Sequence, residues 1–428
     1  MTGTLLYLDT ARMGLMCERA RKAHVDYIRL AGHEGCSLYF DRLFRDGFPA
    51  WPQRLRQRFQ RLSDWRGIEE LKRSLCRIAG TATSSILFTN RTAQLMRLAA
   101  RLFAERCERV LVTDLLWPSY RRILEIERTR DHFGITTVPL RREIMRGELN
   151  WSDAATRIAE QYDRMNCDGM FMPAVSHDGF RLPVDSICEV VAGVRPPRFL
   201  AVDGAQGFCH VPNQLGLGHC DLFITGCHKW LQGHVPMGIG FLPNRSASLI
   251  VSAVDRMLLC DELDDPLLTF SRQLATDSLE MFSETVNLSP LFACRATVAE
   301  RTQNGPDTGI QFQERCRNSD KLQNCLDGTG WSMITPHADF RTGIVLLQVD
   351  DRILRRLDPH TIREFFLAHG ISVTCYEDGL VRLSMRDRPF RAGELALLRW
   401  TLREFAHLTD DSGSSDDSAL HREELALS

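Results

Sequence analysis

Short apolar runs alternate with longer amphipathic runs through the first half of the chain, and this alternation constrains the fold more than any other feature. The apolar runs, each typical of a buried strand, are Ser85–Thr89, Arg109–Thr113, Gly169–Ala174, Phe199–Val202 and Leu222–Thr225. The amphipathic runs, each typical of a helix, include Ala93–Glu105, Pro118–Arg128 and Val184–Ala192. Strands separated by such helices indicate βαβ units. We therefore expect an α/β fold with a mostly parallel sheet.

The rest of the chain suggests a second α/β domain and two terminal segments. A helix that begins at Ile68 and is stopped by Gly80 precedes the first strand. After residue 308 the alternation returns, with strand-like runs at Gly343–Gln348 and Leu380–Met385. We expect residues 1–60 to form a segment that lines the functional site, residues 61–290 a large domain and residues 291–408 a small domain. Residues 409–428 are expected to form a disordered acidic tail.

The composition argues against several classes of protein. The 428 residues carry a formal net charge of -2 at pH 7, so no overall positive field attracts nucleic acid or an anionic membrane. No run approaches the ~18 apolar residues that a membrane-spanning helix requires. The 14 cysteines include no CxxC pair, so neither a zinc site nor a disulfide framework is expected. The N-terminus does not resemble a signal peptide, and we expect reduced thiols and a cytoplasmic location.

Lysine is scarce, and four positions are the only candidates for amine chemistry. Lys22, Lys72 and Lys321 lie in charged stretches that are typical of solvated helix faces. Lys229 instead follows the apolar run Leu222–Thr225. A lysine at the carboxyl end of a parallel strand faces the crevice where α/β sheets bind ligands, and desolvation there favours the neutral, nucleophilic amine. Position alone leaves an ordinary loop lysine as the alternative.

Two further features point to the same kind of site. Asp203 ends the apolar run Phe199–Val202, where a carboxylate can keep a pyridine nitrogen protonated, although an aspartate that only caps the Asp-Gly turn is the alternative. Arg91 and Thr92 lie between an expected strand and an expected helix, where a guanidinium, a hydroxyl and helix N-terminal amides bind an anion. A plain N-cap is the alternative for Thr92. An amine, a carboxylate and an anion site together suit pyridoxal 5'-phosphate (PLP).

The sequence around Lys229 resembles the signature of class V aminotransferases. The segments that carry the resemblance are Asp203–Gln206, His210–Pro212, Cys220–Phe223, His228–Leu231 and Gly238–Phe241. Supporting segments are Tyr7–Ala11, Gly179–Pro183 and Val381–Ser384. The family includes cysteine desulfurases, kynureninase and isopenicillin N epimerase. The resemblance implies the fold-type I PLP-transferase fold, with a seven-stranded sheet in the 61–290 domain that binds the cofactor.

The resemblance also implies a role for each matching residue. Lys229 holds PLP as an aldimine and then moves the Cα proton of a small-molecule amino-acid substrate. Arg382 binds the substrate α-carboxylate, a bidentate task that lysine performs poorly. Thr285 reaches the phosphate of a partner subunit, which implies a homodimer. The other implied contacts are Asp203 at the pyridinium nitrogen, Gln206 near the phenolic oxygen, Trp117 stacked on the ring, and His228, Arg91, Thr92 and the Ala93 amide at the phosphate. For Trp117, a core aromatic residue is the alternative.

The sequence departs from the family at several positions. Gly226 replaces the usual serine or threonine before the lysine, so one phosphate hydroxyl is lost unless Thr225 supplies it. Ser176 or His177 stands where many members carry an asparagine near the cofactor oxygen. Arg12 lies in the segment that lines the substrate mouth, where desulfurases carry a small residue. We expect Arg12 to bind a second anionic group of the substrate, and a surface arginine is the alternative.

The resemblance leaves open the reaction that follows removal of the Cα proton. A desulfurase needs a nucleophilic cysteine on a mobile loop, whereas Cys375 lies in a strand-like run close to Arg382 and is better interpreted as a structural thiol. The Tyr-Asn-Thr triplet usual after this arginine is replaced by Met385–Asp387.

The resemblance therefore implies an enzyme that acts on an amino acid through an external aldimine and a Cα carbanion. The expected reactions are transamination and the elimination or replacement of a side-chain group, in specialised bacterial metabolism. An epimerase or cyclase of the same fold is the alternative, and a desulfurase or a non-catalytic protein of this fold is less favoured.

Overall fold

The computed structural model of the chain contains two compact units. It describes residues 5–34, 41–81, 85–212, 215–243, 246–279, 282–303, 305 and 307–409, so the expected acidic tail lies outside the described residues from position 410 onward. The large unit comprises the described residues of Thr10–Gln313 and Thr335–Thr342. The small unit comprises the described residues of Met1–Asp9, Glu314–Ile334 and Gly343–Ser428. Among the described residues, no helix combines the length and apolar character needed to cross a membrane.

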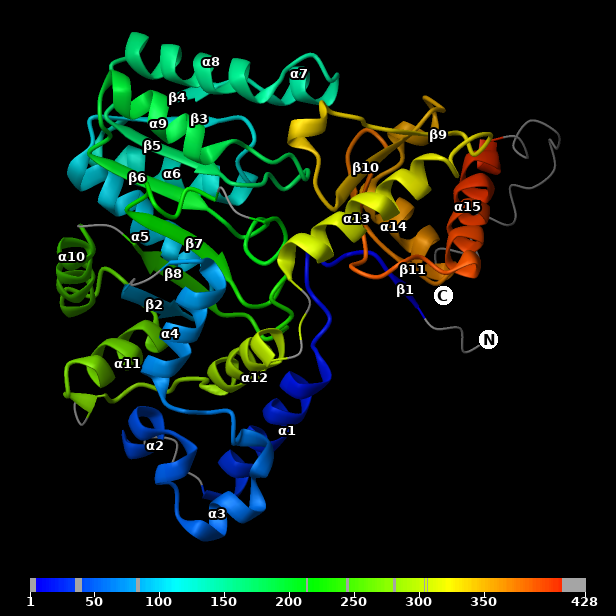
Figure 1. The fold of residues 1–428 in the computed structure, drawn as a ribbon. Helices are drawn as coiled ribbons and strands as arrows, with labels where there is room; N and C mark the ends of the chain where they lie inside the picture. The colour runs from blue at the N-terminus through cyan, green and yellow to red at the C-terminus, as the bar shows by residue number, and fades with distance from the viewer. Residues whose placement is uncertain are drawn as a thin grey trace, which may run out of the picture. The chain divides into compact units, whose positions relative to one another are not determined.

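A seven-stranded sheet forms the centre of the large unit (Figure 1). Its strands are β2 (Ser85–Thr89), β3 (Arg109–Thr113), β4 (Gly134–Val138), β5 (Gly169–Pro173), β6 (Phe199–Asp203), β7 (Leu222–Gly226) and β8 (Gly238–Leu242). Their order is β2-β8-β7-β6-β5-β3-β4. β8 runs antiparallel to β2 and β7, and the remaining neighbours are parallel. The expectation of a mostly parallel seven-stranded sheet is therefore confirmed.

Twelve helices of the described chain belong to the large unit. They are α1 (Glu18–Glu34), α2 (Asp41–Asp46), α3 (Gln53–Arg58), α4 (Ile68–Ala79), α5 (Thr92–Arg106), α6 (Pro118–Asp131), α7 (Arg141–Met145), α8 (Trp151–Arg164), α9 (Val184–Val194), α10 (Ala247–Leu259), α11 (Pro266–Ala275) and α12 (Ser289–Gln303). Gly80 ends α4 in the left-handed conformation, with φ of 70°. This is the conformation that favours glycine after a helix, so the expected helix stop is found where the sequence indicated it.

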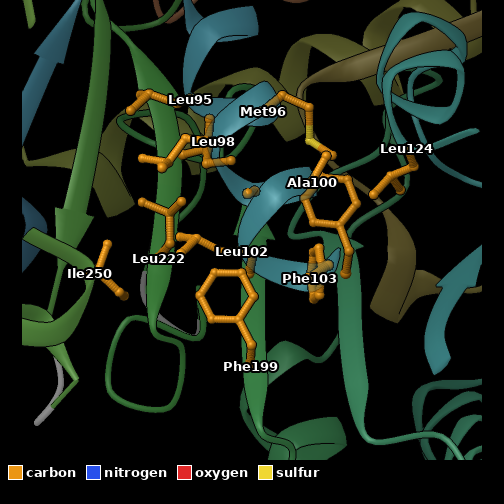
Figure 2. Packing of buried hydrophobic residues seen from close by; sticks show 14 of the residues in the cluster. Leu95, Met96, Leu98, Ala100, Leu102, Phe103, Leu124, Phe199, Leu222 and Ile250 are labelled. Carbon is orange, nitrogen blue, oxygen red and sulfur yellow. The ribbon is translucent and has the colours of Figure 1, made fainter. Parts of the chain in front are cut away.

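Helix α5 packs against β6, β7 and β8. Its side chains gather with Phe199 of β6 and Leu222 of β7 in one buried cluster (Figure 2). Phe103 meets Phe199 edge-on, with ring centroids 4.8 Å apart. Because its inner face is anchored in this way, the N-terminus of α5 is held at the carboxyl end of the sheet, where the expected anion site lies.

Two strands of the sheet were not expected from the sequence. The run that forms β8 contains Gly238 and Gly240, which are typical of a turn. In the structure these glycines allow close packing, because a Cβ on Gly238 would lie 2.1 Å from the Thr89 hydroxyl oxygen and one on Gly240 would lie 2.9 Å from Leu95. The run Gly134–Val138 becomes β4 at the sheet edge, where pairing with β3 outweighs its weak apolar pattern.

The small unit is built on a four-stranded antiparallel sheet. Its strand order is β12-β13-β10-β9, formed by Thr374–Tyr376, Leu380–Ser384, Ile344–Val349 and Trp331–Met333. Its helices are α14 (Pro359–Ala368), α15 (Ala392–Ala406) and most of α13 (Thr308–Gln323). A two-stranded parallel sheet pairs β1 (Leu6–Tyr7) with β11 (Ile371–Ser372).

The unit boundaries differ from those inferred from the sequence. The boundary falls after Gln313, inside α13, rather than after residue 290. The reason is that α12 packs on α1 and α4 and so belongs to the large unit. The N-terminal segment is also divided, since β1 pairs with β11 of the small unit whereas the chain from Thr10 onward belongs to the large one.

Candidate active site

The expected cofactor residues of the large unit follow the carboxyl ends of its parallel strands. Arg91 and Thr92 come after β2, Trp117 after β3 and Ser176 after β5, while Asp203 ends β6 and Lys229 follows β7. Carboxyl ends of parallel strands share one edge of a sheet, which is where open α/β sheets bind ligands. The topology thus brings these residues, which are distant in sequence, to a single edge.

Lys229 lies half-buried on a tight loop after β7. The loop is closed by two main-chain hydrogen bonds, from the Gly233 N–H to the Cys227 carbonyl at 2.7 Å and from the Gln232 N–H to the Lys229 carbonyl at 3.0 Å. The next residue, Trp230, is buried and stacks on the His210 ring with centroids 3.7 Å apart. The lysine is therefore carried by a fixed backbone rather than by a long surface loop.

The segment from Ala11 to Gly14 lies directly against the lysine loop. The Gly14 N–H donates to the His228 carbonyl at 2.7 Å, and the side-chain amide of Gln206 donates to the Ala11 carbonyl at 2.7 Å. A Cβ on Gly14 would lie 1.9 Å from the Lys229 carbonyl oxygen, so only glycine permits this approach. Arg12, which is exposed, lies between the two anchored residues.

Asp203 is a buried carboxylate within electrostatic range of Lys229. One carboxylate oxygen accepts the Ala205 N–H at 2.9 Å. Burial raises the pKa of Asp203 to about 6, while the Ala205 hydrogen bond and the charge of Lys229 act in the opposite direction. Burial also raises the pKa of Tyr120, and the charge of Asp203 adds to this effect, which places the phenol near the carboxylate. A buried acid that faces a lysine is an arrangement that often marks a functional site.

Thr92, His228 and Gly226 form a small cradle at the N-terminus of α5. A Cβ on Gly226 would lie 2.9 Å from Thr92 Oγ1 and 3.0 Å from both Cε1 and Nδ1 of His228. Thr92 Oγ1 and His228 Nδ1 are buried, and neither atom has a hydrogen-bond partner among the described residues. Burial lowers the pKa of His228 to about 4, and the charges of Lys229 and His234 add to this effect.

The cradle has the chemistry of a phosphate site. Arg91, in an extended conformation, is the N-cap residue of α5 and makes no side-chain cap hydrogen bond. The first amides of a helix, including that of Ala93, have no partner within the helix and carry partial positive charge. Two orphaned polar atoms, a guanidinium and these amides fit the phosphate of PLP, and the absence of a side chain at Gly226 allows the two orphaned atoms to lie close to the backbone there.

Other residues expected at the cofactor form hydrogen bonds within the protein itself. Gln206 uses its side-chain oxygen to accept the Trp230 indole N–H at 2.8 Å and one amide hydrogen for Ala11, which leaves one N–H to donate. Thr225 is buried and its hydroxyl donates to the Gly204 carbonyl at 3.4 Å, so its only proton is already used. Ser176 accepts the Phe180 N–H at 3.0 Å within a turn.

Trp117 and Thr285 are both exposed in the described chain. Trp117 is the N-cap residue of α6, is 40% exposed, and meets His177 edge-on with ring centroids 5.4 Å apart. This exposure disagrees with a simple core aromatic. Thr285 lies in the irregular segment that precedes α12.

Arg382 belongs to the small unit and is buried on β13. Its guanidinium donates to the Thr374 hydroxyl at 3.2 Å and lies 3.6 Å from the Asp9 carboxylate. The Tyr376 ring lies 5.6 Å from the guanidinium carbon. The neighbouring Cys375 lies on β12, and burial raises the pKa of its thiol to about 12. The guanidinium of Arg382 is thus fixed by Thr374 and Asp9. Cys375 is a protonated thiol on a strand that is paired within the sheet.

Sequence reasoning missed Gly14, Tyr120 and the stacked pair His210 and Trp230. Tyr120 follows Trp117 by one helical turn, a spacing that could have suggested a shared surface. The packing of Gly14 on the lysine loop joins residues more than two hundred positions apart, and no local pattern indicates it.

Comparisons with known proteins agree with this description. The family model described as aminotransferase class-V matches residues 63–259, a range that contains Arg91, Trp117, Asp203 and Lys229. The match confirms the resemblance seen in the sequence. No curated protein sequence matches the chain.

Solved structures share the fold over nearly the whole chain. A variant of C-DES with glycine covalently linked to its PLP cofactor superposes with a TM-score of 0.67 at 15% identity, covering 94% of this chain and 97% of that one. The cysteine desulfurase CsdA from Escherichia coli gives 0.66 at 12% identity, with coverage of 94% and 95%. A ureidoglycine–glyoxylate aminotransferase from Bacillus subtilis gives 0.64 at 12% identity, with coverage of 98% and 97%. At these identities the similarity shows the fold alone, and it confirms the fold-type I expectation.

Proposed function

We propose that the chain holds PLP on Lys229 and acts at Cα of an amino acid, because residues 63–259 match the model of the aminotransferase class-V family, whose members depend on PLP. The observation that carries the proposal is the convergence of four side chains at one sheet edge. These are the buried Asp203 within range of Lys229, and the orphaned polar atoms of Thr92 and His228 beside Gly226.

Each residue of this edge has a task toward the cofactor. PLP, when bound, supplies a ring that accepts electron density from Cα. Asp203 holds a proton on the ring nitrogen, and its burial strengthens that charge interaction because the surroundings have a low dielectric constant. Thr92, His228 and Arg91, with the Ala93 amide, hold the phosphate.

Four further residues complete the proposed cofactor site. Trp117 covers the ring face, and Gln206 has one amide N–H left to donate to the ring oxygen. Ser176 lies in the turn after β5, where its hydroxyl accepts the Phe180 N–H and keeps its own proton to donate to the ring oxygen. For Thr225 we propose a supporting role under Gly204 in place of a phosphate contact.

Lys229 is the proposed acid and base at Cα. Its amine takes the Cα proton and returns it to a carbon atom, so its position on a fixed loop governs where the proton is delivered. The hydrogen bonds that close the loop, and the packing of Gly14 against it, limit the movement of this amine. Arg382 is the proposed partner of the substrate α-carboxylate, and Thr374 and Asp9 orient its guanidinium.

We propose that Arg12 selects substrates with a second anionic group. It is exposed on a segment that is anchored on both sides to the loops of the site, and it makes no ion pair within the described residues. Arg12→Ala should raise the KM for an amino acid with an anionic side chain about tenfold and leave the KM for a neutral one unchanged. An equal effect on both substrates, or none, would count against this role.

Transamination or elimination is favoured over desulfuration. Desulfuration needs a mobile thiolate, whereas Cys375 lies on a paired strand with its pKa raised to about 12. Epimerisation and cyclisation use the same proton transfer and are the second candidates.

Incubation with a panel of amino acids separates these reactions. Transamination yields a keto acid and leaves the amino group on the cofactor, so that the product stops at one equivalent without an acceptor keto acid. Elimination yields a keto acid, ammonia and the leaving group with many turnovers. Racemised amino acid without keto acid indicates epimerisation. No exchange of the Cα proton with solvent in any substrate would defeat the proposal.

We propose a homodimer in which Thr285 of each copy approaches the phosphate held by the other. Its exposure in a segment before α12 supports this role. Light scattering should give twice the mass of one chain, and Thr285→Ala should weaken PLP binding without splitting the dimer. A monomer that binds PLP as tightly as the dimer would contradict the proposal.

A further inference from the structure

The loop that leads into the phosphate cradle is held by a carboxylate from outside it. The main-chain N–H of Asn90 donates to both oxygens of Asp265, at 2.8 Å and 3.1 Å. Asn90 directly precedes Arg91 and Thr92. Within the loop, the Thr89 hydroxyl donates to the Arg91 carbonyl at 3.0 Å. The backbone that presents the cradle is thus fixed by one internal bond and one external carboxylate.

Asp265 also starts helix α11. One of its oxygens accepts the Leu268 N–H at 2.9 Å, which makes it the N-cap residue of a helix with proline at its first position. The side chain is buried, with 2% exposure, and burial raises its pKa to about 6. A helix cap needs only one acceptor atom, and serine serves as well as aspartate at this position. Capping alone therefore does not explain a buried carboxylate that reaches a second segment.

A second contact joins the same two segments. The side-chain amide of Gln94, in the first turn of α5, donates to the carbonyl of Asp264 at 2.7 Å. Residues 264 and 265 therefore hold the cradle on both sides, at Asn90 before it and at Gln94 after it. Ordering a loop before the ligand arrives lowers the entropic cost of binding, so this support should increase phosphate affinity.

We propose that Asp265 is a positioning residue for the phosphate of the cofactor, acting through the Asn90 N–H on the neighbouring residues Arg91 and Thr92 at the cradle. The inference rests on the proposed function, since it assumes that this cradle holds the phosphate of PLP. It adds a residue outside the matched family segment and couples cofactor affinity to the start of α11.

Three variants of the full chain separate positioning from capping. Asp265→Ser keeps a capping oxygen but is too short to reach Asn90, and Asp265→Asn keeps an acceptor of the original length. Asp358→Ser is the matched control, because Asp358 caps α14 in the small unit, also ahead of a proline, and accepts the N–H groups of His360 and Thr361. Each apoprotein is titrated with PLP and with pyridoxal, which lacks the phosphate.

Loss of the hydrogen bonds between the Asn90 N–H and Asp265 should weaken the binding of the phosphorylated ligand only. Asp265→Ser is expected to weaken PLP binding about tenfold and to leave pyridoxal binding unchanged. Asp265→Asn should stay within about threefold of the wild type, and Asp358→Ser should match the wild type for both ligands. A weakening in Asp265→Ser that is equal for PLP and pyridoxal, or no weakening of PLP, would overturn the inference. Wild-type protein that binds neither ligand would instead overturn the proposed function, and this inference with it.

Discussion

Asp203→Asn tests whether the buried carboxylate that is proposed to serve the cofactor lowers the stability of the apoprotein. Burial raises the pKa of Asp203 from 3.8 to about 6. Between these values Asp203 binds more protons in the folded chain than in the unfolded chain, so its contribution to stability falls as the pH rises from about 4 to about 6. One pKa unit corresponds to ~1.4 kcal/mol, so the ionised carboxylate lowers the free energy of unfolding by about 3 kcal/mol at pH 7.

The amide in the variant has no charge to desolvate and keeps an oxygen that can accept the Ala205 N–H. We therefore expect the free energy of unfolding of the Asp203→Asn apoprotein, relative to wild type, to rise by about 2.5 kcal/mol between pH 4 and pH 7. Urea denaturation at the two pH values measures this difference. The same variant should lose catalytic activity, because the neutral amide no longer holds a proton on the ring nitrogen.

Asp358→Asn provides a control with the opposite sign. Hydrogen bonds from Thr361 lower the pKa of the exposed Asp358, so its contribution to stability is present above its usual pKa and is lost as the pH falls. If the unfolding free energies of wild type and Asp203→Asn change in parallel from pH 4 to pH 7, ionisation of the buried carboxylate does not lower stability. That result would refute the expected pH dependence.

Three further substitutions test other parts of the account. Gly204→Ala places a Cβ 1.9 Å from the Phe223 ring and should destabilise the protein by about 3 kcal/mol in urea denaturation, whereas Gly193→Ala, with open space around it, should not. Arg382→Lys keeps the charge but loses the bidentate fork, so the KM for the amino acid should rise at least ~10-fold with a smaller change in kcat. Burial lowers the pKa of His228 to about 4, so the stability of the wild-type apoprotein relative to His228→Gln should fall as the pH falls from 6.5 to 4; equal pH dependence in both proteins would argue against a buried neutral histidine.

Most strands of the large unit could be predicted from the sequence because their apolar runs are bounded by helices. β8 could not, because its glycines serve contacts with Thr89 and Leu95 that no local pattern encodes. The boundary after Gln313 was also missed, since it depends on which helices α12 packs against. Local periodicity therefore predicted helices and strands, but not which distant helices and strands they pack against.

The candidate site shows the same division. Lys229, Asp203 and Thr92 could be proposed from the sequence because each lies at or just after the end of a recognisable strand. Two hydrogen bonds were not expected, from Thr225 to the Gly204 carbonyl and from the Asn90 N–H to Asp265. Each joins residues that are distant in sequence, and local sequence patterns do not indicate such pairs. The resemblance to a family could name residue types at the site, and only the structure could show which of their atoms are already used.

The most direct test of the central claim is the chemical location of the cofactor. PLP-loaded protein is reduced with borohydride, digested and examined by mass spectrometry, which fixes the cofactor to the amine that carries it. Modification of Lys229 alone among the four lysines is expected, and none in Lys229→Ala. Stoichiometric modification of Lys22, Lys72 or Lys321 with Lys229 untouched, or an absence of any bound cofactor, would contradict it.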